Sequence, residues 1–165
     1  MYCLTCAIQF FDGTIKRNYK TKELHVVEHI KTNFPNFDFI ADKRIEGGCS
    51  KKRPDLFFDY GSHIIIIEVD EFQHKMVSCE EKRTIEILED NQWKNTTFIR
   101  FNPDSFYLND KKILSCWKCN KLGVLTIAKG KEQEWQERLQ LLIDTIQFHI
   151  ENEPTKPLTV VKLFY

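Results

Sequence analysis

The chain has 165 residues, 42% hydrophobic and 29% charged, which is the composition of a globular protein with one domain and a substantial core. Its 24 basic and 24 acidic residues balance, so any binding to nucleic acid needs a local basic patch rather than an overall attraction. The longest apolar run, at 64–67, is too short to cross a membrane, and the first residues do not have the pattern of a secretion signal. We therefore expect an intracellular protein of cytoplasm or nucleus, neither secreted nor attached to a membrane.

The first predicted element is a helix in TKELHVVEHIKTNFP, residues 21–35. Leu24, Val27, Ile30 and Phe34 recur at helical spacing, Thr21 is placed to cap the start, and Pro35 ends the helix. FDFIADKRI then alternates as a strand. PDLFFDYGSHIIIIEVDE predicts two strands joined by a turn at 60–62, and the unbroken apolar run of the second suits a central strand covered on both faces.

The second half of the chain predicts a helix at 79–90, a buried strand at 96–102, a long helix at 133–151 and a final strand in LTVVKLFY. Apolar residues of the long helix, such as Trp135, Leu139 and Leu142, recur at three- and four-residue intervals. Residues 105–131 show no clear pattern. This order predicts an α/β (α+β) fold with a central mixed sheet of about four to five strands flanked by helices.

Three acidic residues mark a candidate catalytic centre. A hairpin would bring Asp55, at the start of one strand, beside Glu68 and Asp70 at the end of the next. Grouped carboxylates repel each other unless a hard divalent cation lies among them. Such an ion, Mg²⁺ or Mn²⁺, activates water and stabilises charge on a phosphodiester. His74 lies four residues after Asp70, where it could transfer a proton.

Basic residues precede these acids and would bind phosphates on either side of the ion. They are Lys43, Arg44, Lys51, Lys52 and Arg53. Each feature also has a plain alternative when taken singly: a solvated basic loop, strand-end acids that face water, or a structural histidine. Their occurrence together favours a nuclease site.

The motif RPD, a twelve-residue interval and then ExD resembles the PD-(D/E)XK nuclease signature. The longer string IIIIEVDEFQH…CEEKR…FIRFNPD resembles the branch related to very-short-patch-repair endonucleases, and similar cores occur in large DNA viruses and protists. The resemblance implies a restriction-endonuclease-like domain over residues 21–165, preceded by a cysteine-containing segment at 1–20. It also implies a DNA endonuclease that uses Mg²⁺ or Mn²⁺.

Transferred to this sequence, the family's metal-binding acids are Asp55 and Glu68, with the carbonyl of Val69 as a further ligand. Asp70 stands where the family usually has lysine, so Asp70 and His74 both remain eligible as the general base. The family often adds an acid from the first helix, which matches Glu23, with Glu28 as the competing choice. Gln73 and Arg83 complete the expected nucleic-acid contacts, although Arg83 fits an intrahelical salt bridge equally well.

Two CxxC pairs provide a separate signal. Cys3, Cys6, Cys116 and Cys119 could together bind a structural Zn²⁺ ion, although the pairs lie far apart in the sequence. Cys3 and Cys6 are explained equally well as the remnant of an upstream cysteine-rich repeat.

Three functional hypotheses follow. The first is a metal-dependent DNA endonuclease, which would act as a homodimer if one site per chain is to cut both strands. The second is a nucleic-acid-binding module of the same fold without catalysis, which the missing motif lysine favours. The third is a zinc-stabilised interaction protein.

Overall fold

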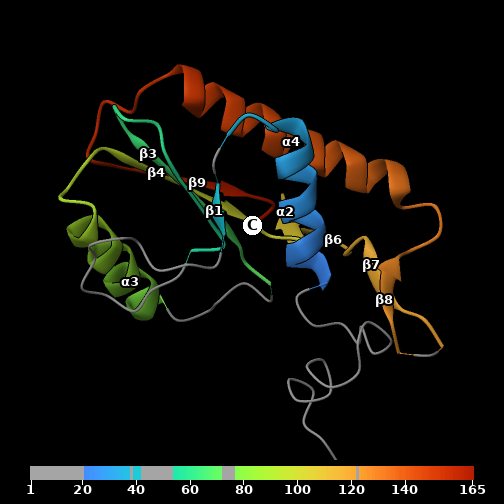
Figure 1. The fold of residues 1–165 in the computed structure, drawn as a ribbon. Helices are drawn as coiled ribbons and strands as arrows, with labels where there is room; N and C mark the ends of the chain where they lie inside the picture. Colours follow the sequence, from blue (N-terminus) through green and yellow to red (C-terminus); the bar gives the residue numbers. More distant parts are fainter. Residues whose placement is uncertain (1–20, 38, 42–53, 72–76, 122) are drawn as a thin grey trace, which may run out of the picture.

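The computed structural model describes residues 21–37, 39–41, 54–71, 77–121 and 123–165, and for residues 41 and 77–83 it describes the backbone alone. Within these ranges three helices flank a five-stranded sheet (Figure 1). The helices are α2 (Thr21–Asn33), α3 (Val77–Asp90) and α4 (Glu132–Glu151). None of the described helices is long and apolar enough to span a lipid bilayer.

The sheet has the order β1-β2-β3-β4-β9. Its strands are β1 (Ile40–Ala41), β2 (Leu56–Asp59), β3 (Ile64–Val69), β4 (Thr96–Phe101) and β9 (Leu158–Leu163). The pairs β1–β2 and β2–β3 are antiparallel, whereas β3–β4 and β4–β9 are parallel. Gly61, with φ of 88°, supplies the left-handed turn between β2 and β3. This mixed sheet flanked by helices confirms the predicted fold class.

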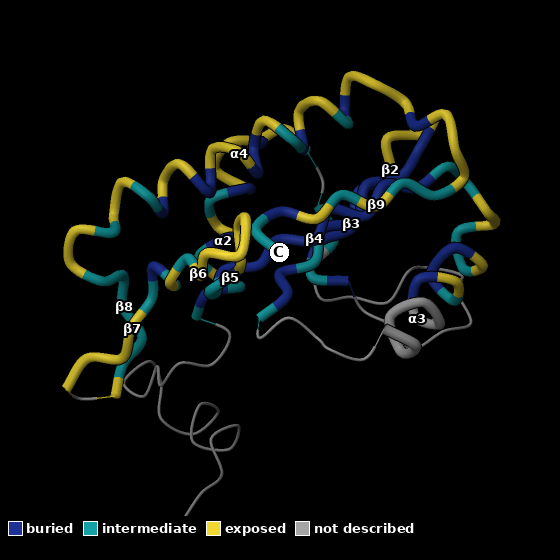
Figure 2. Tube along the Cα trace, turned by 180° about the vertical axis from the view of Figure 1, so that it is seen from behind, coloured by how far each residue is buried: buried dark blue, intermediate teal, exposed yellow. Residues whose placement is uncertain are grey.

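Helices cover the sheet on both faces. On one face, α2 and α4 pack over a large core, while Ile87 of α3 packs on the other face against the alternate residues of the same strands. Along β3, Ile65 and Ile67 therefore face α2 and α4, and Ile64 and Ile66 face α3. The central strands are almost completely buried (Figure 2), which confirms the prediction for the isoleucine run.

The buried face of α2 agrees with the prediction from Val27 onward and differs from it at Leu24. Leu24 is 49% exposed, whereas Val26 and Ile30 are fully buried. The apolar stripe therefore starts later in the helix, and Lys22 lies on the buried side of the first turn. Thr21 is already a helical residue rather than the cap that precedes the helix.

Two short hairpins occupy the stretch for which the sequence showed no pattern. They are formed by β5 (Phe106–Leu108) with β6 (Lys111–Ile113), and by β7 (Trp117–Cys119) with β8 (Leu125–Ile127). Three-residue strands are too short for alternation to be recognised. The signal that could have revealed the first hairpin is Asn109-Asp110, because both residues have the positive φ that a tight two-residue turn requires.

Candidate functional site

Four charged residues form one row across the sheet, near the carboxyl ends of β3, β4 and β9. Glu68 is in register with Arg100, and Arg100 is in register with Lys162. Asp55 immediately precedes β2, where the β2–β3 register places it opposite Glu68. We call Asp55, Glu68, Arg100 and Lys162 the charged row. Side chains alternate along a strand, so the row lies on the α3 face, two residues beyond the Ile66 and Phe98 core.

The two acids of the row are also linked through the backbone. Asp55 Oδ2 accepts a hydrogen bond of 2.7 Å from the N–H of Val69, the residue that follows Glu68. This bond holds the Asp55 carboxylate against the end of β3. The carbonyl of Val69, which was predicted as a further metal ligand, accepts a 3.1 Å hydrogen bond from the N–H of Glu71. A carbonyl oxygen has a second lone pair, so this bond is compatible with a metal contact.

Asp70 lies just past β3, where it is only 7% exposed. Its N–H donates to the carbonyl of Phe101 at 2.9 Å, and its Oδ2 accepts a 2.6 Å bond from the Tyr165 hydroxyl. The Lys162 ammonium lies 5.3 Å from the centre of the Tyr165 ring. The Asp70 carboxylate is therefore held by a residue that follows β9. No local pattern in the sequence relates Tyr165 to Asp70, which lies 95 residues earlier, so this bond was not predicted.

Tyr165→Phe is expected to lower the free energy of unfolding by about 1.5–3 kcal/mol, the contribution of a hydrogen bond to a charged group. Urea denaturation of the two proteins measures the difference. Tyr107→Phe is the matched control, because the Tyr107 side chain is 63% exposed on β5. An equal change in both variants would contradict a stabilising role for the bond to Asp70.

The first turn of α2 lies at the same end of the sheet. Lys22 is 5% exposed and its ammonium contacts Asp104 Oδ1 at 2.6 Å and Glu71 Oε2 at 3.7 Å. These contacts place the neighbouring Glu23, which is half-buried, close to the ends of β3 and β4. Glu28 is exposed farther along the helix, so Glu23 is the better placed of the two acids.

A metal ion at this site would use the oxygen ligands that Asp55 and Glu68 bring together, which suit Mg²⁺ or Mn²⁺. Among the described residues, no group of three His, Cys, Asp or Glu side chains is gathered closely enough to hold an ion. The pair would therefore need ligands beyond these carboxylates. Backbone carbonyls, water and substrate phosphate are the usual ones for Mg²⁺.

The two cysteines of the second CxxC pair lie in different environments. Cys116 is fully buried in the core beneath α2 and α4, whereas Cys119 is exposed at the end of β7. Burial, reinforced by nearby Glu134 and opposed by Arg138, raises the pKa of the Cys116 thiol to about 11. Without a metal ion, this pKa keeps the Cys116 side chain as a neutral thiol. The zinc prediction remains a prediction, since the first pair lies outside the described residues.

Several predicted site residues also lie outside the described part of the chain: Lys43, Arg44, Lys51, Lys52, Arg53, Gln73 and His74, together with Cys3 and Cys6. For Arg83 the structure describes only the backbone, which lies in α3. Of the other polar residues near the sheet end, Asn102 is fully buried and bonds to the carbonyls of Ser105 and Phe164, which indicates a structural role.

Comparison with known proteins found no relative. No protein-family model, curated protein sequence or solved structure matches the chain. The charged row and its surroundings are therefore the basis of the functional proposal.

Proposed function

We propose that the chain is a divalent-metal-dependent endonuclease of the restriction-endonuclease-like fold, which hydrolyses phosphodiester bonds in DNA. The charged row carries this proposal. Asp55, immediately before β2, stands beside Glu68 of β3, and two cations continue the same row on β4 and β9. Neighbouring strands lie about 4.8 Å apart, so a phosphate could contact both halves of the row at once.

The acids and the cations of the charged row would have different roles in the reaction. Asp55 and Glu68 would hold Mg²⁺ or Mn²⁺, which supplies an activated water and charge stabilisation when bound. Arg100 and Lys162 would bind the phosphate oxygens beside the acids and offset the charge that develops there. They would thereby provide the positive charge that Asp70 removes from the usual motif position. Asp70 and His74 remain the candidates for accepting a proton from the attacking water.

The test compares cleavage of supercoiled plasmid and single-stranded DNA by the wild type, Asp55→Asn and Glu68→Gln, in Mg²⁺ or Mn²⁺. We expect each substitution to slow cleavage about 100-fold or more, since a metal-binding acid supports several kcal/mol of transition-state stabilisation. Glu153→Gln, an exposed acid near the end of α4, is the matched control and should cleave like the wild type.

Three outcomes would contradict the proposal. Cleavage that both substitutions leave unchanged would place the reaction elsewhere in the chain. Inactivity of the wild type and both variants, with DNA binding intact, would favour the non-catalytic binding module, for which the replacement of the motif lysine by Asp70 is the supporting observation. Bound zinc without DNA binding or cleavage would favour the zinc-stabilised interaction protein.

A further inference from the structure

The positive charge of this chain is concentrated in one segment. Residues 111–131 contain six lysines and no Asp or Glu, a charge of +6, although the whole chain has a net charge of zero. The remainder therefore carries −6. Such an asymmetry within a neutral chain indicates a surface for an anionic partner.

The structure places this segment in the two hairpins, which are fixed to the carboxyl end of the sheet. The N–H of Ser115 donates to Ser105 Oγ at 3.0 Å, and its hydroxyl donates to the carbonyl of Pro103 at 3.3 Å. Trp117 of β7 packs edge-on against Trp135 of α4, with ring centres 5.4 Å apart. Both hairpins thus extend from the end of the sheet at which Glu68 and Arg100 lie (Figure 1).

Five lysines of the segment are exposed: Lys111, Lys112, Lys118, Lys121 and Lys129, called here the hairpin lysines. Across the part of the chain that the structure describes, no ion pair involves any of them. The sixth, Lys131, differs because it bonds to Glu134. The hairpin lysines can therefore bind a partner without breaking a contact within the described fold.

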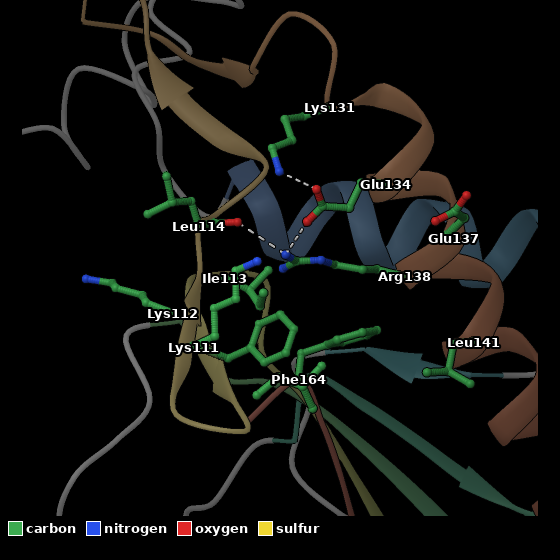
Figure 3. A pocket seen from close by; sticks show the side chains of 12 residues that line it. Lys111, Lys112, Ile113, Leu114, Lys131, Glu134, Glu137, Arg138, Leu141 and Phe164 are labelled. Atoms are coloured by element: carbon green, nitrogen blue, oxygen red, sulfur yellow. Dashed lines mark hydrogen bonds and ion pairs between the residues drawn. The ribbon is translucent and has the colours of Figure 1, made fainter.

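A hollow of about 670 Å³ lies between the first hairpin and α4 (Figure 3). Some of the basic side chains around it bond to Glu134 and others do not. At its upper wall, Glu134 receives bonds from both Lys131 and Arg138. Lys112 points away from these groups toward solvent. Arg138, the buried cation of α4, bonds to the carbonyl of Leu114 next to the first hairpin, whereas Lys112 faces outward.

We propose that the hairpin lysines bind the phosphate backbone of the nucleic acid that reaches the charged row. The inference rests on the proposed function, of which it locates the substrate-binding surface. Lysines bind phosphates as point charges without reading sequence, and they position a duplex relative to the site that acts on it. Exposed lysines spread over two fixed hairpins and the turn that follows them suit an extended polyanion better than a small ligand, which needs an enclosed pocket.

The test measures binding of a fluorescently labelled DNA duplex in EDTA, where metal-dependent cleavage cannot occur. Anisotropy titrations at several salt concentrations compare the wild type with Lys111→Gln/Lys112→Gln and Lys118→Gln/Lys121→Gln. Each phosphate contact contributes about 0.9 to the slope of log Kd against log salt concentration. Each double variant is therefore expected to reduce that slope by about 1–2 and to weaken binding by about tenfold or more at low salt.

The matched control is Lys31→Gln/Lys156→Gln, which removes the same charge from two exposed lysines at the opposite end of the sheet. It should keep the wild-type slope. Hairpin variants that behave like this control, or a wild type that does not bind the duplex, would overturn the inference. Neither result depends on cleavage. Conversely, binding through the hairpins without cleavage in Mg²⁺ or Mn²⁺ would support this surface and reject the nuclease activity.

Discussion

Trp135→Ala is expected to lower the free energy of unfolding by about 3–5 kcal/mol, the usual cost of removing a large buried ring. The indole is fully buried, and the ring centres of Trp117 and Phe101 lie 5.4 and 5.8 Å from it. Its Nε1–H donates to Nδ1 of His25 at 3.3 Å. Burial, partly opposed by Glu28, lowers the pKa of His25, which keeps the ring neutral and able to accept this bond. Urea denaturation measures the loss.

The comparison for this variant is Trp93→Ala. Trp93 is 56% exposed, so its removal should change stability by no more than about 0.5 kcal/mol. Because Trp135 also supports Trp117, we expect amide hydrogen exchange in β7 and β8 to accelerate in Trp135→Ala. Equal losses of stability in the two variants would show that the buried ring does not organise this core.

Arg138→Met is expected to lower the free energy of unfolding by about 3 kcal/mol, because it breaks a buried charged network. The guanidinium is 3% exposed and donates to the carbonyls of Asp104 and Leu114 at 3.1 and 3.3 Å. It also donates to Glu134 at 2.6 Å. These bonds join α4 to the end of β4 and to the first hairpin, so their loss should also weaken DNA binding by the hairpin lysines.

A second measurement separates this network from simple packing. Burial opposes ionisation of Glu134, but bonds from Lys131 and Arg138 outweigh it and hold the pKa of Glu134 below its usual value. NMR titration should therefore show a higher Glu134 pKa in Arg138→Met. Arg138→Lys should recover only part of the stability, since an ammonium cannot span three acceptors in the plane of a guanidinium. Full recovery by lysine would contradict the account.

Patterns within single elements predicted most of the architecture. The spacing of Trp135, Leu139 and Leu142 predicted α4, and the isoleucine run predicted that β3 is covered on both faces. These predictions succeeded because burial imposes its period on neighbouring residues of one helix or strand. The buried face of α2 was misread at Leu24, where the orientation of the first turn depends on contacts of Lys22 with Asp104 and Glu71.

Local patterns were enough to predict the helices, the long strands and the closeness of Asp55 to Glu68, because a short hairpin joins β2 to β3. They could not predict that Arg100 and Lys162 continue the same row or that Tyr165 bonds to Asp70. The reason is physical: the register of parallel strands is set by long crossover connections and by packing against α3 and α4, which no local pattern records.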